Sequence, residues 1–371
     1  MKNILLLIRC LVGLLFIFSG LIKANDPLGL SYKMQEFFEA WNLQGFHNYT
    51  LWLAIVMNTL EVVAGIAVII GWQMKRFSWL LLLLILFFTF LTSYVLFSGK
   101  IHACGCFGDC VPLTPIQTFT KDIILLLLIL ILFFKVVDVK PMFTKITSIA
   151  IVSLSFVFVL VLQFYVQKYL PLLDCLPYAK GKNIVEGMQL PKGAVADSSV
   201  ITFKYKKNGK EMEFDQNNFP EDFDSTYEYV DRFDKLIRKG TGLPKIVDFS
   251  LTTLYANDTT QAILAQENRY ILLFVKDFTN LNDWKTGDFG LIVDAAKAKN
   301  IPMFLVTADA VVAQENFSSL PILKCDATVI KTAARVNPTY FVMQKGNVLA
   351  KYSYANARKI LNDISNIFSA S

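Results

Sequence analysis

Residues 77–97 read FSWLLLLLILFFTFLTSYVLF and carry no charged side chain. A helix needs about 20 predominantly apolar residues to cross the hydrocarbon core of a membrane, so this run is long enough to span one. More runs of similar length and apolar character occur at residues 4–22, 51–72, 116–134 and 146–165. The sequence therefore predicts five membrane-spanning helices.

The composition of the chain agrees with an integral membrane protein. Hydrophobic residues make up 54% of the 371 residues and charged residues 18%, which is more apolar surface than a soluble domain of this length needs. The excess lies before residue 170, whereas residues 180–371 have the mixed composition of a globular domain. We therefore expect a domain boundary near residue 170.

The placement of lysine and arginine predicts the orientation in the membrane. The net charge is +6, but the basic residues lie beside hydrophobic runs and form no arginine-rich or aromatic-interleaved patch, so a nucleic-acid partner is not expected. Lys2, Lys75-Arg76 and the connection at residues 135–145 fall on one side, which the positive-inside rule makes cytoplasmic. We expect the cytoplasmic (inner) membrane of a bacterium, with the N-terminus cytoplasmic and the chain after about residue 167 periplasmic.

The first apolar run resembles a secretory signal peptide in its basic start and apolar middle. No small-residue cleavage site follows it and residues 23–26 are polar, so we expect a retained helix. Asp26-Pro27 is then a plausible start for a second helix. The apolar residues of one face of that helix are Met34, Phe37, Phe38 and Trp41. This spacing predicts an amphipathic helix in the outer interface of the membrane.

A loop at residues 99–115, between the third and fourth predicted spans, contains HACGCFGDC at residues 102–110. Thiols outside the cytoplasm meet an oxidising compartment, so this group is expected to cycle between disulfide and dithiol or to bind metal. The glycines let the backbone bend enough to bring sulfurs together. Cys106 and Cys110 are the sterically easier pair, whereas a Cys104–Cys106 bond would close a strained ring and be reduced more readily.

Three interpretations of the loop are open. Cys104, Cys106 and Cys110 are candidate catalytic thiols of an exchange reaction, which is the interpretation we favour. Alternatively, a structural disulfide staples the loop. In the third interpretation His102 and the cysteines bind zinc, although a Cys-x-Cys spacing differs from the usual Cys-x2-Cys knuckle, and we predict no metal.

Several motifs resemble the MauE/DoxX family of redox-associated membrane proteins. They are Phe18-Ser19-Gly20 with Lys23 and Asp26-Pro27 after the first span, Glu61 in the second span, and Cys104-Gly105-Cys106-Phe107-Gly108 in the loop. The resemblance covers about residues 1–140. It implies an all-α four-helix membrane bundle, similar in arrangement to vitamin K epoxide reductase-like proteins and linked to disulfide chemistry outside the cytoplasm. Residues 141–170 then add a fifth transmembrane helix.

Ionisable residues at membrane depth are costly, so each is a functional candidate. Glu61 is either a proton relay or a contact to a quinone-like acceptor, or it is an interhelical partner, for example of Arg9. Lys121 and Asp122 either lower a thiol pKa and take up its proton, or snorkel to the outer headgroups. We treat these acidic and basic groups as possible auxiliary residues and a quinone as the candidate cofactor. Cys10 is expected to be an inert buried thiol.

Residues 171–245 are dense in Gly, Pro, Asp, Asn and Lys. The alternation in residues 200–206, the Asn208-Gly209 turn and the return through Phe214 predict a β-hairpin. We assign this stretch as a β-rich extracytoplasmic connector.

Residues 246–371 show a regular alternation of strands and helices. Strands are expected at 270–275, 302–307, 337–343 and 348–352, and helices at 289–299, 327–334 and 356–368. A βαβ unit followed by an antiparallel hairpin and a closing helix is the order of thioredoxin. Asn337-Pro338-Thr339 also resembles the cis-proline segment of the thioredoxin superfamily. The expected fold class of this part is an α/β thioredoxin-like domain.

One departure from that superfamily concerns its Cys-x-x-Cys motif. Residues 276–284 contain no cysteine, so the domain lacks the nucleophile of the usual exchange reaction. Pro338 and Thr339 are left as candidate partner-binding residues of a groove for an extended peptide. Cys175 pairs with a loop cysteine or with Cys325, or is idle. Cys325 is either a buried structural thiol or takes part in a mixed disulfide.

Two functions follow from these interpretations. In the first, the loop cysteines pass electrons between periplasmic thiols and a membrane acceptor, and the outer domain recruits a periplasmic thiol or disulfide protein. In the second, the protein is a non-catalytic membrane subunit or assembly factor whose thioredoxin-like domain binds a partner, such as a subunit of a membrane complex. The lipid bilayer is a partner in both.

Overall fold

The computed structural model describes residues 2–101, 104–195, 198–215, 218–220, 222–238, 240 and 242–366. Contacts divide the chain into two compact units. One unit is Met1–Gly181 with Ser250–Ser371, and the other is Lys182–Phe249.

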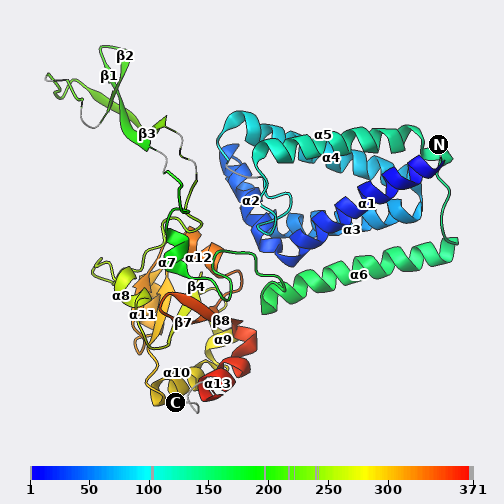
Figure 1. Ribbon diagram of the computed structural model, residues 1–371. Helices are drawn as coiled ribbons and strands as arrows, with labels where there is room; N and C mark the ends of the chain where they lie inside the picture. The colour runs from blue at the N-terminus through cyan, green and yellow to red at the C-terminus, as the bar shows by residue number, and fades with distance from the viewer. Residues whose placement is uncertain are drawn as a thin grey trace. The chain divides into compact units, whose positions relative to one another are not determined.

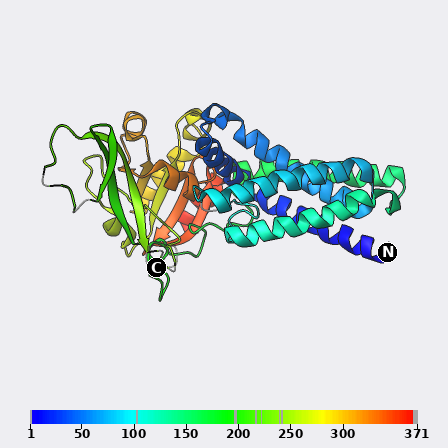
Figure 2. The same cartoon turned by 90° about the horizontal axis from the view of Figure 1, so that it is seen from above.

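Within the described residues, five helices are long and apolar enough to cross a membrane, which confirms the five predicted spans. They are α1 (Lys2–Asn25), α3 (Thr50–Ile70), α4 (Met74–Ser98), α5 (Pro115–Phe134) and α6 (Lys145–Tyr169). Helix α1 packs on α3, α4 packs on α5, and α6 packs on α3. Figure 1 and Figure 2 show these helices running side by side.

Glycines let α1 and α3 approach closely. A Cβ atom on Gly13 would lie 2.7 Å from the Gly65 carbonyl oxygen, and one on Gly20 would lie 2.6 Å from Val62. Helices in a bilayer associate largely through such close packing, because lipid is as apolar as their side chains. This close packing brings polar residues of α1 and α3 within reach of each other.

Helix α2 (Pro27–Ala40) and the 3-10 turn η1 (Gln44–Tyr49) connect α1 to α3. The Asp26 carboxylate caps α2 by accepting a 3.0 Å hydrogen bond from the Gly29 N–H, and Pro27 occupies the first turn. This confirms the predicted helix start. Thr114 and Gln117 form a capping box that starts α5 directly after the cysteine loop.

In the described part of residues 250–366, five strands form a mixed sheet in the order β6-β5-β4-β7-β8. The strands are β4 (Tyr270–Val275), β5 (Met303–Thr307), β6 (Ile322–Lys324), β7 (Thr339–Gln344) and β8 (Asn347–Ser353). Strands β4, β5 and β6 are parallel, and β7 and β8 are antiparallel to their neighbours. The predicted α/β class of this region is confirmed.

Helices cover this sheet and bury its central strand. They are α8 (Thr260–Leu264), α9 (Leu281–Lys285), α10 (Phe289–Ala298), α11 (Ala310–Asn316), α12 (Ala327–Ala333) and α13 (Ala357–Asn366), with the 3-10 turn η3 (Tyr354–Asn356). Every residue of β4 is buried, and Leu273 shares a core with Ile292 of α10 and Ile360 of α13. Such burial on both faces explains the continuous apolar run of this strand.

Most predicted bounds in this region agree with the structure to within two residues. Helix α11 and strand β6 were not predicted, and they extend the parallel side of the sheet. A strand of three residues is too short to show a periodic pattern. The closing helix, predicted at 356–368, begins at Ala357, and residues 367–368 lie outside the described residues. The Asn337–Pro338 peptide bond before β7 is cis.

The described residues of Lys182–Phe249 form α7 (Ile184–Met188) and three strands, β1 (Ser198–Lys207), β2 (Lys210–Asp215) and β3 (Glu228–Arg238). The strands are antiparallel in the order β2-β1-β3. Asn208 and Gly209 have φ values of 52° and 80°, as a tight hairpin turn requires, and the predicted hairpin is confirmed. Tyr205 and Phe223 belong to an aromatic cluster on this sheet.

Candidate functional site

Two thiols of the cysteine loop (residues 99–115) face each other. Cys104 Sγ and Cys106 Sγ lie 3.3 Å apart, and neither is disulfide-bonded. Gly105 between them has a φ of 72°, which suits glycine, and the Gly108 N–H closes the turn on the Gly105 carbonyl oxygen at 2.9 Å. A shift of about 1 Å would bring the sulfurs to bonding distance. The loop therefore holds these thiols in a geometry suited to reversible bond formation.

The two thiols differ in acidity. The hydrogen bond with Cys104 lowers the pKa of Cys106 against the opposing effect of burial, and the charge of Lys121 adds to the lowering. The hydrogen bond with Cys106, together with burial, raises the pKa of Cys104. In the protonated pair Cys106 donates to Cys104, and once Cys106 ionises Cys104 becomes the donor. These directions make Cys106 the expected thiolate of the pair, an assignment that stays a prediction.

The third loop cysteine, Cys110, is bonded to Cys175, with 4.9 Å between their Cα atoms. Pairing of Cys106 with Cys110, favoured on steric grounds from the loop alone, is therefore wrong. The pairing of Cys175 with a loop cysteine is confirmed, and its alternative pairing with Cys325 is wrong.

Tertiary contacts explain how Cys175 reaches the loop. The Asn25 side chain, at the end of α1, accepts hydrogen bonds from the N–H groups of Leu172 and Leu173 and donates to the Leu173 carbonyl oxygen, at 2.8–3.1 Å. Lys351 of β8 forms a 2.8 Å ion pair with Asp174. These contacts hold the segment after α6 against the end of α1, beside the loop. These contacts join segments far apart in the chain, so the spacing of the loop cysteines alone could not predict them.

Glu61 of α3 is fully buried and pairs with Lys23 of α1, so the considered pairing with Arg9 is wrong. Arg9 instead donates from Nη1 to a backbone carbonyl oxygen at 3.2 Å. Ser19 Oγ lies 3.0 Å from Glu61 Oε2 and 3.0 Å from the Cys106 carbonyl oxygen. The buried ion pair is thus connected to the cysteine loop. Lys23 was singled out only as part of the family motif.

Lys121 and Asp122 at the start of α5 also face the cysteine loop. Their Nζ and Oδ1 atoms lie 2.5 Å apart, and Thr92 Oγ1 donates to Asp122 Oδ2 at 3.1 Å. Asp122 is fully buried, and Lys121 Nζ lies 4.8 Å from the centre of the Phe107 ring. Asp122 is therefore not at the headgroups, whereas the Lys121 side chain is partly exposed and both alternatives stay open for it.

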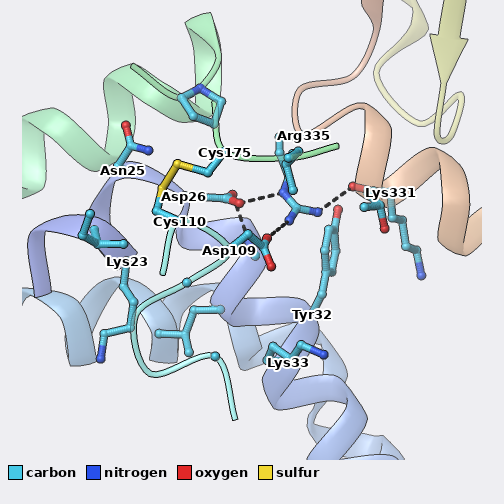
Figure 3. A pocket seen from close by; sticks show the side chains of 18 of the residues that line it. Lys23, Asn25, Asp26, Tyr32, Lys33, Asp109, Cys110, Cys175, Lys331 and Arg335 are labelled. Atoms are coloured by element: carbon cyan, nitrogen blue, oxygen red, sulfur yellow. Dashed lines mark hydrogen bonds and ion pairs between the residues drawn. A yellow bond between two sulfur atoms is a disulfide. The ribbon is translucent and has the colours of Figure 1, made fainter. Parts of the chain in front are cut away.

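Arg335, between α12 and β7, joins the α/β region to the cysteine end of the bundle. Figure 3 shows its guanidinium between two carboxylates, with Nε 2.8 Å from Asp26 Oδ2 and Nη2 3.0 Å from Asp109 Oδ2. Burial opposes the charged form, but the two carboxylates outweigh it and raise the pKa of Arg335. A planar guanidinium suits two carboxylates at fixed angles better than an ammonium does. A single arginine between a helix and a strand carries no sequence signal for this role.

Lys276, the residue after β4, lies beside this contact. Its Nζ donates to the Arg335 carbonyl oxygen at 2.8 Å and lies 3.4 Å from the Tyr32 hydroxyl of α2. Burial lowers the pKa of Lys276 to about 8. Lys276, which begins the segment where the thioredoxin superfamily places its Cys-x-x-Cys motif, thus contacts α2 of the bundle.

Two pockets border the cysteine loop. A polar pocket of about 320 Å³ is lined by Cys110 and Cys175 and by charged side chains, among them Arg335 (Figure 3). An apolar pocket of about 260 Å³ lies among α2, α3, α4 and the loop and is lined by Cys104 and Cys106. The loop thus presents its disulfide to one pocket and its thiol pair to the other.

The remaining predicted site residues lie elsewhere. Pro338 and Thr339 are buried at the start of β7, and Thr339 Oγ1 donates to a backbone carbonyl oxygen, so neither side chain is open to a partner in this structure. Cys325 is buried in the α/β region, and burial raises the pKa of Cys325 to about 12. A thiol of that acidity is a poor nucleophile at neutral pH. Cys10 is a partly buried free thiol of α1.

The zinc interpretation concerns His102, which lies outside the described residues. Among the residues that are described, no three His, Cys, Asp or Glu side chains form a group suited to a metal ion.

Five apolar helices with a buried ion pair next to a loop of thiols describe an integral membrane protein with a cysteine site. Residues 1–135 match the family described as "Methylamine utilisation protein MauE", which confirms the MauE part of the expected resemblance. Residues 199–239 match "Domain of unknown function (DUF8463)". The DoxX and thioredoxin-like expectations stay predictions.

A relative among curated proteins is Protein TlpB of Flavobacterium psychrophilum. It is 31% identical over 130 residues, which is 34% of this chain and 35% of that protein. The chain therefore matches about a third of the length of this relative. No solved structure matches the chain.

Proposed function

We propose that this protein carries out thiol–disulfide exchange outside the cytoplasm of a bacterium and passes electrons between extracytoplasmic thiols and a membrane acceptor. The observation that carries the proposal is the unbonded Cys104–Cys106 pair, whose sulfurs lie 3.3 Å apart in the loop that also holds the Cys110–Cys175 disulfide. The MauE match over the bundle supports a membrane setting for this chemistry.

The exchange reaction uses the different acidities of the pair. The Cys106 thiolate attacks one sulfur of a client disulfide, which forms a mixed disulfide and releases the other client sulfur as a thiolate. Cys104 then loses its proton and attacks the Cys106 sulfur, forming the Cys104–Cys106 bond and releasing the second client thiolate. The client gains two electrons and the pair loses two. The same steps in reverse let client thiols reduce the pair, and the proposal covers both directions.

The Cys110–Cys175 disulfide is the proposed contact point for clients. Cys175 is exposed and lines the polar pocket, so a client thiolate can attack its sulfur and release Cys110 as a thiolate. A second client thiolate then attacks the mixed disulfide, which oxidises the client and leaves Cys110 and Cys175 reduced. The Cys104–Cys106 disulfide reoxidises them by the reverse of the steps above, with Cys110 and Cys175 in the place of the client thiols. Lys121 and Asp122, beside the loop, are the proposed groups that hold charge and protons as the thiols ionise.

For the α/β region we propose a thioredoxin-like fold without a catalytic role. Its order β4-α10-β5 followed by β7-β8-α13 supports this assignment. The region has no cysteine at residues 276–284, and Arg335 holds it on the cysteine end of the bundle. Its proposed task is to bring a client to the polar pocket.

The orientation is testable on whole cells. We propose that the cysteine loop and the α/β region lie outside the cytoplasm. An impermeant maleimide should label a cysteine introduced at the exposed Lys299 and should spare one introduced at the exposed Lys75. If the cysteine at position 75 were labelled and the cysteine at position 299 were not, the orientation would be the reverse of the proposed one. The proposed function would then be wrong.

Thiol trapping with mass mapping in native membranes tests the exchange itself. Under reducing and oxidising conditions, Cys104 and Cys106 should interconvert between trapped thiols and a disulfide, while Cys10 and Cys325 stay trapped as thiols. Constant states of all loop cysteines would favour a non-catalytic subunit or assembly factor. The observation that supports this second candidate is the missing cysteine after β4.

A further inference from the structure

The apolar pocket beside the thiol pair has an aromatic lining. It is lined by Phe37, Phe38, Trp41, Phe87 and Phe88, together with Met34, Leu53, Met57 and Leu91. The helices that supply these side chains include α3 and α4, two of the five apolar spans. A molecule of the bilayer interior is therefore the natural occupant, because the pocket offers almost no polar contact to a water-soluble one.

Lys23 is an exception to the apolar lining. It is 2% exposed, pairs with Glu61, and its Nζ lies 4.6 Å from the centre of the Phe88 ring, which lines the pocket. A cation that is buried inside the protein is costly unless it is paired, so its place beside an apolar pocket marks it as a functional candidate. Glu61 in turn is linked through Ser19 to the backbone of Cys106. A charged donor and a redox pair therefore border the same apolar space.

We propose that this pocket binds a lipophilic quinone, with Lys23 Nζ donating a hydrogen bond to one of its carbonyl oxygens. The inference rests on the proposed function, for which it names the membrane acceptor. A flat ring carrying two carbonyl groups and an apolar tail matches aromatic walls with a buried donor. A lipid acyl chain would fill the space equally well but has no group for Lys23 and no reaction with the thiols.

The electron balance also fits this class of molecule. When Cys104 and Cys106 form a disulfide, they release two electrons and two protons. A quinone takes up two electrons and two protons and becomes a hydroquinone, so no other co-reactant is required. Lys23 would hold a proton at the oxygen that it contacts, and the two protons released by the thiols would balance the two that a hydroquinone carries. In the opposite direction a hydroquinone reduces the Cys104–Cys106 disulfide and releases the two protons.

Binding of a short-chain ubiquinone to the full-length protein in lipid nanodiscs tests the inference. The measurement is quenching of tryptophan fluorescence, since Trp41 lines the pocket. A prenylated benzene of the same size, without carbonyl groups, serves as the control ligand. The wild-type protein and a Cys104→Ser/Cys106→Ser variant should both bind the quinone, because binding does not need the thiols. Equal binding of the control ligand would mean that the pocket is a lipid site only and would overturn the inference.

The role of Lys23 has its own test. Lys23→Met should weaken quinone binding about tenfold, which is the loss of one hydrogen bond from a charged donor. Lys75→Met, the same change at an exposed site, should leave the dissociation constant unchanged. Because Lys23→Met leaves Glu61 buried and unpaired, Met57→Phe provides a second variant that fills part of the pocket without adding a tryptophan and should also weaken binding. Unchanged binding in both variants would overturn the site.

These outcomes separate the inference from the proposed function. Client-driven cycling of the Cys104–Cys106 pair without quinone binding would overturn the quinone site and leave thiol exchange intact. If the quinone bound but Cys104 and Cys106 never changed their redox state, the quinone site would be supported. The proposed thiol–disulfide exchange would be contradicted.

Discussion

Arg335 and Asp109 form an ion pair of 3.0 Å, although 226 residues separate them along the chain. The same guanidinium binds Asp26, the cap of α2, at 2.8 Å. One buried side chain of the α/β region thus contacts both the cysteine loop and the helix that borders both pockets. Arg335 is therefore positioned to hold the α/β region on the cysteine end of the bundle.

Replacing Arg335 should loosen this contact. Arg335→Met removes both ion pairs, and we expect the free energy of unfolding to fall by about 1–3 kcal/mol, less than for a deeply buried pair because Asp26 and Asp109 can regain water. Amide hydrogen exchange should rise in residues 26–32 and 104–110. Arg358→Met, the same change at an exposed arginine, is the control and should alter neither quantity.

A double-mutant cycle of Arg335→Met with Asp109→Asn measures the pair itself. We expect a coupling energy of about 1 kcal/mol, with the double variant less destabilised than the sum of the single variants. Strict additivity would mean that the contact does not form in the membrane.

The Cys110–Cys175 disulfide makes a direct prediction for peptide mapping. Digestion without reduction should give a cross-linked peptide that contains both residues. Cys175→Ser should free Cys110 for alkylation and lower the free energy of unfolding by about 2–4 kcal/mol, because the bond closes a long loop. Cys10→Ser is the matched control and should change neither result. A peptide linking Cys106 to Cys110 would contradict the structure.

The broad fold was predictable because the bilayer and the sheet impose simple patterns. A span must be about 20 apolar residues long, and a strand buried on both faces must be apolar throughout, so α4 and β4 were found from single runs of sequence. The pairing of α1 with α3 could not be predicted, because the contact between Gly13 and Gly65 forms only when the two helices pack together. Strand β6 is too short to show a pattern.

The sequence predicted which residue types form the site, but it did not predict which residues they contact. Cysteines in a loop and Glu61 in a span are conspicuous on their own, because each is costly or reactive where it stands. Their partners Cys175 and Lys23 come from other segments that only tertiary contacts bring together, and Arg335 reaches Asp26 and Asp109 in the same way. The mistaken pairings of Glu61 with Arg9 and Cys106 with Cys110 share this cause.

The buried pair of Lys23 and Glu61 should behave as a unit. Lys23→Met or Glu61→Gln alone leaves a charge or a polar group buried without its partner, at a cost of about 3–5 kcal/mol in the free energy of unfolding. The double variant should recover part of that loss in detergent unfolding experiments. Arg9→Met combined with Glu61→Gln should be additive, because Arg9 donates to a backbone carbonyl instead. Coupling of Glu61 to Arg9 would contradict the assigned pair.

The acidity of Cys106 should depend on its neighbours. In a Cys10→Ser/Cys325→Ser background, the rate of Cys106 alkylation rises with pH as the thiolate forms. Cys104→Ala removes the hydrogen bond that lowers the pKa of Cys106, so the midpoint of the rate profile should move to higher pH. Lys121→Met should move it in the same direction by less. Lys100→Met, in the same loop, is the control and should leave the midpoint unchanged. A shift of the midpoint to lower pH in Cys104→Ala would contradict the assignment of Cys106 as the nucleophile.

The covalent bond between Cys110 and Cys175 also constrains how the protein is made. During synthesis Cys110 leaves the ribosome 65 residues before its partner, in the company of two other thiols of the same loop. Correct pairing must therefore wait until α6 has been inserted. A fragment ending at residue 135, as the matched family region suggests, would expose an orphan thiol and would have lost the arginine that holds the loop. Recombinant work on the bundle should start from the full chain, produced where oxidative folding catalysts operate.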